Sequence, residues 1–279
     1  MLLVVAVGVA FSYLFAFGWV GVGVAVVVAL AMAWGSYWNS DKIALRITRA
    51  RPADPHTYAR LYNLVEGLCI ASGLPMPRLY IVDDPAPNAF ATGRDPKHAA
   101  VAVTSGLLEK MNRIELEAVL AHELSHVKNY DTLVATLAVT MVGAVALLAD
   151  IGLRFLVFGG RRSSNSNAGG LVALISLLFI ALAPLAATLM RYAVSRRRES
   201  LADLSAVEMT RYPPGLIAAL EKLRDDTTVV RENNRATAHL WIEEPMPQYE
   251  GDDPRRSRWS HLFDTHPPIE ERIAALREL

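Results

Sequence analysis

Two histidines and a glutamate occur at a spacing that suits metal-assisted hydrolysis. The segment AHELSH (121–126) places His122 and His126 four residues apart, so on a helix their imidazoles lie one above the other on the same face. Zinc binds neutral imidazole nitrogens and keeps one position open in catalytic sites. Glu123 would flank the metal, where its carboxylate can take a proton from the attacking water. The alternative is a chance string with surface histidines and a solvated glutamate.

A second acidic segment offers the ligand that this set lacks. In RRRESLAD (196–203), Glu199 and Asp203 are again four residues apart and share a helix face. Glu199 can complete a set of two histidines and one glutamate around zinc. Asp203 can accept the outer N–H of a ligating histidine and thereby fix its tautomer. Taken alone, such a pair is equally compatible with a solvated helix face.

The elements that must position these residues are predicted as helices beside a small sheet. Asn112, followed three residues later by Glu115 and then by a periodic apolar run, indicates a capped amphipathic helix that carries the histidines. Residues 79–82 and 99–103 have the β-branched, apolar character of strands. We therefore expect a mainly α-helical fold with a small antiparallel β-sheet. The intervening stretch 88–93 could equally be a plain hairpin loop.

The composition points to a protein with both membrane segments and a water-facing part. Hydrophobic residues make up 52% of the 279 residues and charged residues 20%. Residues 1–40 carry no charged side chain, and neither do 133–149 and 171–190. Since a spanning helix needs about 20 apolar residues, we expect about four transmembrane helices arranged as two hairpins. One long helix in the first run, and buried helices in a soluble core for the other two, are the alternatives.

This reading divides the chain into four parts. They are an N-terminal transmembrane hairpin (1–40), the first part of the catalytic domain (41–131), a second transmembrane hairpin (132–190) and the rest of the catalytic domain (191–279). Basic residues follow both hairpins, which by the positive-inside rule places the catalytic domain in the cytoplasm, on a multi-pass protein of the cell membrane. The basic residues Arg154, Arg161 and Arg162 disagree with this topology and leave the second crossing in doubt.

Charge and cysteine content exclude several other classes. Lys plus Arg and Asp plus Glu are both 28, so nothing in the net charge points to nucleic acid as a partner. The single cysteine, Cys69, cannot form an intrachain disulfide or a thiolate zinc cluster. The basic run 196–198 is interpreted as an interfacial anchor or a lipid-headgroup contact. The acidic, proline-bearing segment 243–254 is expected to be a loop of unassigned role.

Taken together, these motifs resemble the HtpX family of bacterial membrane zinc proteases, which is related to the CAAX prenyl proteases. The matching segments are NAFATG (88–93), AHELSH (121–126), RRRESLAD (196–203) and THPP (265–268) with Arg272-Ile273. The resemblance implies one zinc ion per chain, held by His122, His126 and Glu199, with Asp203 as a helper acid. It also implies proteolytic quality control of misfolded or damaged membrane proteins, often within a stress response.

The resemblance assigns further residues around the reaction. It implies that the NAFATG stretch is the sheet edge to which an extended substrate adds as a strand, with Asn88, Ala89 and Phe90 as substrate-binding residues. It implies that His266 donates to the oxyanion of the transition state and that Arg272 borders the active site. From the residues alone, His266 is better read as part of a turn beside two prolines.

Two competing functions stay open at this point. One is a prenyl-protein protease with the same chemistry and a narrower substrate, although such enzymes enclose the metal within more membrane helices than this length permits. The other is a non-catalytic metal-binding scaffold in the membrane. The sequence gives no indication of the oligomeric state, the regulation or the physiological substrates.

Overall fold

Two segments that are far apart in the sequence form one folded unit. In this computed structural model, contacts divide the chain into a first unit, Met1–Asn39 with Leu137–Arg191, and a second unit, Ser40–Thr136 with Tyr192–Leu279. The structure describes residues 31, 34–35, 37–39, 41–135, 196–226, 228 and 268–279. The second unit therefore contains nearly all of the described elements, which follow here.

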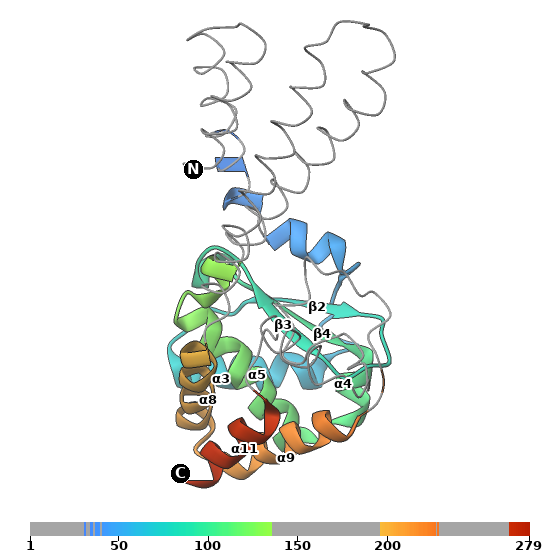
Figure 1. Ribbon diagram of the computed structural model, residues 1–279. Coiled ribbons are helices and arrows are strands. Elements are labelled where there is room, and N and C mark those ends of the chain that lie inside the picture. Colours follow the sequence, from blue (N-terminus) through green and yellow to red (C-terminus); the bar gives the residue numbers. More distant parts are fainter. Residues whose placement is uncertain are drawn as a thin grey trace, which may run out of the picture. The chain divides into compact units, whose positions relative to one another are not determined.

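A four-stranded sheet lies in this unit, with strands β1 (Arg51–Pro52), β2 (Arg78–Val82), β3 (Ala89–Thr92) and β4 (Ala100–Thr104) in the order β1-β2-β4-β3. Strands β1 and β2 pair antiparallel, as do β3 and β4, but β2 and β4 pair parallel. The predicted antiparallel sheet is therefore wrong, and the sheet is mixed. The cause is β3, because the chain reverses once before it and once after it, so β4 returns in the direction of β2 (Figure 1).

The strands alternate side chains between two apolar layers. Leu79, Ile81, Val101 and Val103 face the larger core, which they share with helices of this unit. Tyr80, Val82, Phe90, Ala100 and Ala102 belong to a smaller cluster with Ala44 and Leu45 of the helix over residues 41–47. This period of two is what a strand buried on both faces requires, and it explains why these strands read as continuous apolar runs.

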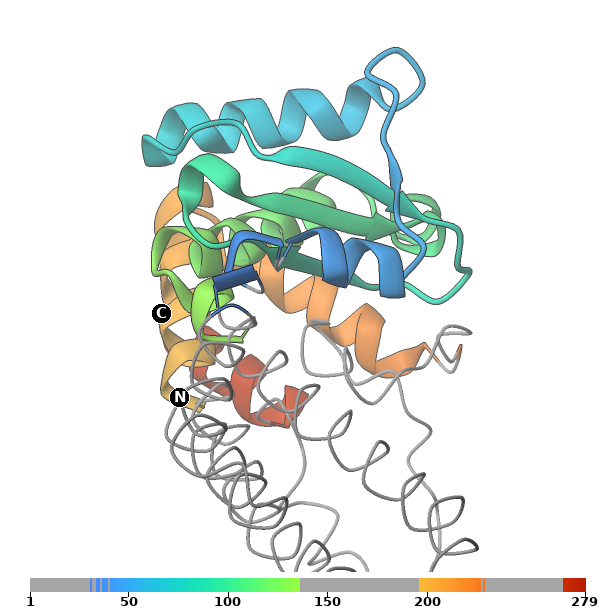
Figure 2. The same ribbon diagram turned by 90° about the horizontal axis from the view of Figure 1, so that it is seen from above.

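Besides the helix over residues 41–47, six helices of at least six residues accompany the sheet in the described part of this unit. They are α3 (Ala59–Ser72), α4 (Ser105–Lys110), α5 (Arg113–Lys128), α8 (Arg196–Thr210), α9 (Pro213–Asp225) and α11 (Ile269–Arg277), besides the short 3-10 helix Pro96–His98. Helices α3 and α5 lie on the same side of the sheet (Figures 1 and 2). Helix α5 also contacts β3, α8 and α9, so it is central to the larger core.

The predicted start of the histidine-bearing helix is confirmed. The Asn112 side chain accepts hydrogen bonds from the backbone N–H of Ile114 and Glu115, and the Glu115 carboxylate accepts one from the backbone N–H of Asn112. This reciprocal capping box satisfies N–H groups that the first turn leaves without helical partners. Lys222 of α9 donates to the same Glu115 carboxylate at 2.6 Å, which ties α5 to α9.

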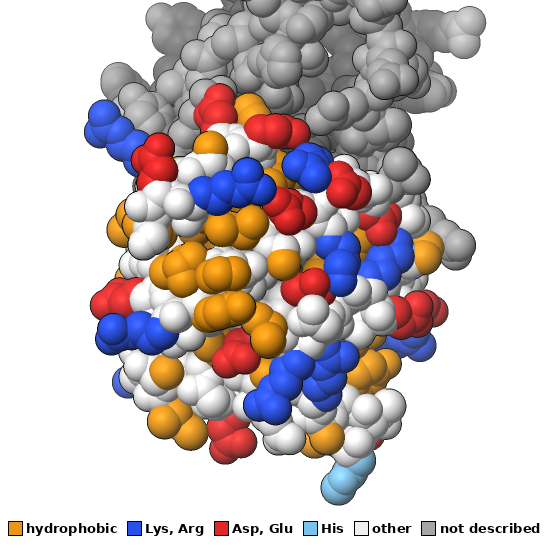
Figure 3. All heavy atoms as spheres, turned by 90° about the horizontal axis from the view of Figure 1, so that it is seen from below, with side chains coloured by type: hydrophobic (Ala, Val, Ile, Leu, Met, Phe, Trp, Pro, Cys, Tyr) orange, Lys and Arg blue, Asp and Glu red, His pale blue; other side chains and the backbone are white. Residues whose placement is uncertain are grey.

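The predicted transmembrane hairpins fall almost entirely outside the described residues, as does the segment 243–254. Among the helices that the structure does describe, none combines the length and the apolar character that crossing a membrane requires. Seen from below, the described surface of the second unit carries Lys and Arg side chains interspersed with Asp and Glu around a group of hydrophobic side chains (Figure 3). Both signs of charge thus share this face.

Candidate metal centre and active site

Helix α5 presents both histidines toward one point. The Nε2 atoms of His122 and His126 lie 3.1 Å apart, and the two rings stand at 90° with their centroids 4.7 Å apart. His122 is fully buried, and the His126 side chain is 14% exposed. The spacing of four residues on one helix therefore directs the same nitrogen of each ring toward a shared position.

Helix α8 adds a carboxylate to this position. Glu199 Oε2 lies 3.6 Å from His122 Nε2, and Glu199 Oε1 lies 3.6 Å from His126 Nε2. The buried residues of helix α8 recur at helical spacing: Glu199, Ala202, Asp203 and Ala206. The two alanines are small enough to allow close packing of α8 against α5. The structure thus brings the two segments together.

The donor set suits a zinc ion. Ligand atoms of His122, His126 and Glu199 all lie within 4.8 Å of one another. Two nitrogens bound to one tetrahedral zinc at about 2.0–2.1 Å are roughly 3.3 Å apart, and the observed separations of 3.1 and 3.6 Å bracket that value. Two imidazoles with one carboxylate also leave a fourth position open, as catalytic zinc sites do. These residues therefore fit the metal.

The outer nitrogen of His122 is held by a buried ion pair. His122 Nδ1 lies 2.8 Å from Asp203 Oδ1. Arg272 of α11 donates to both Asp203 oxygens, from Nε at 2.9 Å and from Nη2 at 2.7 Å. Because Nδ1 bonds to the carboxylate, Nε2 of the neutral ring is left to accept a metal. Arg272 thus contacts the carboxylate that orients the His122 ring, which places it beside the candidate site.

Burial and these charges change the pKa values of His122 and Asp203. Burial lowers the pKa of His122, but the hydrogen bonds to Asp203 and Glu199 more than compensate and raise it to about 9. Burial raises the pKa of Asp203, yet the guanidinium of Arg272 and the bond to His122 hold it far below its usual range. The carboxylate is therefore ionised at any physiological pH and can accept the ring proton.

The outer nitrogen of His126 has a carboxylate partner that sequence reasoning missed. His126 Nδ1 lies 3.1 Å from Asp131 Oδ2, and Arg198 Nε lies 3.8 Å from Asp131 Oδ1. The interpretation of the run 196–198 as an anchor is wrong for Arg198, whose side chain is 20% exposed and directed to Asp131. Asn129 is the sequence signal that could have indicated a chain reversal here, because asparagine is favoured just after the ends of helices.

Glu123 lies inside the site rather than on the surface. It follows His122 directly on α5 and is 2% exposed. Burial lowers the pKa of Arg272, but nearby carboxylates raise it above its usual value. Asp203 and Glu199 have the larger effects, and the negative charge of Glu123 adds a smaller one. A buried carboxylate next to the ligand pair excludes the alternative of a solvated glutamate on a surface helix.

The predicted substrate-binding residues form the edge of the sheet rather than a loop. Ala89 and Phe90 begin β3, which occupies the end of the strand order next to β4. The side chains of Asn88, Ala89 and Phe90 are all buried, and the backbone N–H of Asn88 donates to Thr104 Oγ1 at 2.9 Å. Because β3 also contacts α5, this edge strand is a neighbour of the histidine-bearing helix.

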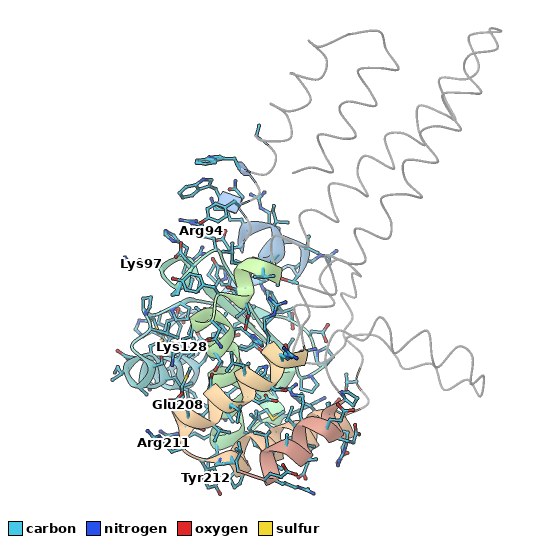
Figure 4. All side chains as sticks on the ribbon, turned by 60° about the vertical axis from the view of Figure 1, so that its left-hand side comes forward. Arg94, Lys97, Lys128, Glu208, Arg211 and Tyr212 are labelled. Atoms are coloured by element: carbon cyan, nitrogen blue, oxygen red, sulfur yellow. The ribbon has the colours of Figure 1, made fainter. Side chains whose placement is uncertain are left out.

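One predicted catalytic residue is not placed. His266 lies outside the described residues, although Arg272 on the helix that follows it is described. Three labelled side chains project outward from the unit: Lys128, which ends α5, Glu208 of α8, and Arg211, which directly follows α8 (Figure 4). These three residues are exposed, so they supply substitutions that leave the buried cluster untouched.

Comparison with known proteins gives the family of this arrangement. A model of peptidase family M48 matches residues 55–279, which include both ligand-bearing helices and α11. The chain belongs to peptidase family M48. Members of this family are metal-dependent peptidases, so the enzymatic nature of the chain and its identification as a metalloprotease are confirmed.

Curated relatives confirm the resemblance to the HtpX proteases. This M48 peptidase is 49% identical over 243 residues to a protein named "Protease HtpX homolog" from Tropheryma whipplei, covering 87% of this chain and 80% of the relative. It is 44% identical over 250 residues to a protein of the same name from Caldanaerobacter subterraneus, covering 88% and 80%. A third, from Dictyoglomus thermophilum, is 45% identical over 242 residues, covering 87% and 76%.

A solved structure shares the fold at much lower identity. The crystal structure of Ste24p from S. mikatae aligns with a TM-score of 0.53 and 19% identity, covering 90% of this chain and 57% of that protein. At this identity the match supports the fold of the M48 peptidase and not its substrate. The fold is thus mainly helical with a small mixed sheet.

Proposed function

We propose that this M48 peptidase is a zinc-dependent endopeptidase of the cell membrane that hydrolyses misfolded or damaged membrane proteins. The observation that carries the zinc site is the convergence of His122 Nε2, His126 Nε2 and the Glu199 carboxylate on one position. The names of the relatives support the protease activity. One zinc ion per chain is the metal that best suits two imidazoles and a carboxylate.

Glu123 acts as the general base and then as the general acid. A zinc ion, when bound, supplies Lewis acidity that polarises the peptide carbonyl and acidifies water. The Glu123 carboxylate takes a proton from the attacking water while the oxygen of that water forms a bond to the carbonyl carbon. It then delivers that proton to the amine nitrogen as the C–N bond breaks. Its burial beside His122 suits this role, because charges act more strongly where bulk water is excluded.

The substrate binds as an added strand along β3. An exposed edge holds a peptide in the extended form through main-chain hydrogen bonds, and extension brings one peptide bond to the metal. Because β3 stands at the end of the strand order beside β4, we assign these contacts to the backbone of residues 88–90. This mode accepts many sequences, because main-chain bonds do not depend on the side chains of the substrate. Such tolerance suits an enzyme that clears damaged proteins.

Two further residues complete the proposed machinery. His266 serves as the hydrogen-bond donor to the oxyanion that forms during attack; the resemblance in the THPP segment carries this assignment. Arg272 acts indirectly, since it donates to Asp203, which in turn accepts from the ligand His122. Replacing His266 with alanine should therefore lower the rate without releasing metal, whereas a change at Arg272 should affect metal affinity.

The membrane location and the orientation rest on the sequence. The charge-free runs 1–40, 133–149 and 171–190 are long enough for about four spanning helices, and basic residues follow each hairpin. We therefore propose that the second unit faces the cytoplasm and that the substrates lie in or at the bilayer. Modification of single-cysteine variants by a membrane-impermeant thiol reagent, applied to intact cells and to inverted vesicles, tests this orientation.

Casein cleavage by the full-length protein in detergent tests the proposed activity. We expect casein hydrolysis and self-cleavage that stop on chelation, return with stoichiometric zinc and are absent in Glu123→Gln. A farnesylated peptide tests the CAAX-type alternative. The 44–49% identity to HtpX homologues favours the present proposal, whereas the 19% identity to Ste24p bears on the fold alone. Preference for that peptide over casein would reverse the assignment. Intact cellular function of Glu123→Gln would favour the scaffold.

A further inference from the structure

Each histidine of the metal site is paired, through its outer nitrogen, with a different aspartate. His122 has Asp203, whose carboxylate is held by Arg272. His126 has Asp131, whose second oxygen lies 3.8 Å from the guanidinium of Arg198. The two arrangements follow the same order of ligand, carboxylate and guanidinium. The second one contains Asp131, to which the proposed function gives no role.

The backbone is bent so that Asp131 reaches back to His126. Helix α5 ends at Lys128, and the N–H groups of Asn129 and Tyr130 bond to the carbonyls of Ser125 and Val127. Tyr130 has a φ of 60°, a left-handed conformation that is unfavourable for a non-glycine residue. Helical structure resumes at residue 131. Strain of this kind persists where the surrounding structure maintains it, and it concentrates at functional sites.

The geometry of the ring gives the carboxylate a specific effect. His126 Nε2 faces His122 Nε2 and Glu199 Oε1, so Nδ1 is the atom left to bond to the protein. A carboxylate that accepts Nδ1–H keeps the proton off Nε2, fixes the ring plane and increases the basicity of the ligand. The guanidinium of Arg198 lies 3.8 Å from the other oxygen of this carboxylate, and Arg198 belongs to α8, the helix that carries Glu199.

We propose that Asp131 is a positioning residue of the metal site, which holds His126 in the tautomer and orientation that bind the metal, with Arg198 as its support. This inference rests on the proposed metal site and adds to it a second carboxylate–histidine pair. Asp131 also begins the helical segment that runs into the apolar stretch 133–149. The proposal thus links the geometry of one ligand to the first residues of a predicted membrane segment.

Metal affinity of the metal-free, full-length protein in detergent tests this role. Zinc is titrated against a competing chromophoric chelator, and Co²⁺ absorption reports the ligand geometry. We expect Asp131→Ala to bind zinc about 10–100-fold more weakly than wild type and to change the Co²⁺ spectrum, with Asp131→Asn intermediate because its amide is a weaker acceptor. Arg198→Ala should lower the affinity less than Asp131→Ala does.

The matched control is Asp226→Ala. Asp226 is as buried as Asp131, with side-chain exposures of 14% and 13%, and it pairs with Lys110 away from the histidines. It should leave both the zinc affinity and the Co²⁺ spectrum unchanged. Wild-type affinity in both Asp131 variants would overturn the proposal. If the alanine variant does not fold without metal, the asparagine variant decides, and its wild-type affinity would overturn the proposal equally.

A failure of the proposed function would look different. Glu123→Gln should bind zinc as wild type does while casein cleavage is lost. If the wild-type protein binds zinc and cleaves casein but the Asp131 variants bind normally, then only the positioning role fails. If the wild-type protein binds no zinc, or if Glu199→Ala leaves its affinity unchanged, then the metal site itself is wrong.

Discussion

The carboxylate of Asp203 lies between two partners, with Oδ1 2.8 Å from Nδ1 of His122 and 2.7 Å from Nη2 of Arg272. The contact joins α5, α8 and α11 at one buried point. Because α8 and α11 are separated along the chain by α9 and by a long segment outside the described residues, the completed site depends on tertiary packing of the C-terminal helix. Stability and metal binding are therefore linked through Asp203.

The buried pair of Asp203 and Arg272 should show strong coupling in unfolding experiments. Arg272→Ala leaves a buried carboxylate without its cation and is expected to cost roughly 3–5 kcal/mol in the free energy of unfolding. Asp203→Ala should cost a similar amount, and the double variant should cost less than the sum of the two. Denaturant unfolding of the metal-free protein measures this cycle.

A second pair on α11 provides the control for that cycle. Arg277 donates to Glu221 at 2.7 Å, but both side chains are largely exposed, at 63% and 37%. Its removal should change the free energy of unfolding by less than about 1 kcal/mol. Additive costs at Asp203 and Arg272 would show that the two groups do not act as a pair.

Zinc binding should become tighter as the pH rises toward 9. The metal-free site holds a proton on His122 below its raised pKa of about 9, and this proton must leave before Nε2 can bind the metal. The apparent affinity should therefore increase by up to roughly tenfold per pH unit between neutral pH and that value. Calorimetric titrations in buffers of different ionisation enthalpy should detect the released proton, and an affinity independent of pH would contradict the assignment.

Gly93, the last residue of the NAFATG stretch, should not accept a side chain. It has a φ of 130°, and a Cβ atom there would lie 2.5 Å from the carbonyl oxygen of His98. Gly93→Ala should lower the free energy of unfolding by roughly 1–3 kcal/mol and should impair casein cleavage, because it distorts the turn between β3 and β4. Denaturant unfolding and the initial rate of cleavage provide the two readings.

Gly67 is the matching glycine without such a constraint. It lies on the exposed face of α3, where a Cβ atom would meet nothing within 4 Å. Gly67→Ala should therefore stabilise the protein by roughly 0.4–1 kcal/mol and leave cleavage unchanged. Equal effects of the two substitutions would show that the turn at Gly93 is not strained.

The parts of the site that depend on local spacing could be predicted from the sequence. His122 and His126 share a helix face because they are four residues apart, and the capping box at Asn112 is likewise a local pattern. The mixed sheet could not be predicted in the same way, because pairing of β2 with β4 depends on where β3 is inserted. Strand character is local, whereas strand order is not.

The two residues that support the histidines illustrate the same difference. Arg272 contacts Asp203 only after α11 has folded against α9 and α8, and no spacing in the sequence specifies that contact. Asp131 is five residues from His126, which is not a neighbouring position on a regular helix. It becomes a partner only because Tyr130 adopts a left-handed conformation, and the segment contains no glycine that would have indicated such a bend.

The central claim is that side chains of two separate helices hold one metal ion, and zinc content after substitution on α8 tests it most directly. Glu199 points to the histidines, whereas Glu208 on the same helix is exposed and directed outward (Figure 4). Wild type and Glu208→Ala should each retain one zinc per chain through dialysis, while Glu199→Ala should lose it. Retention of zinc by Glu199→Ala, with undiminished casein cleavage, would contradict the account.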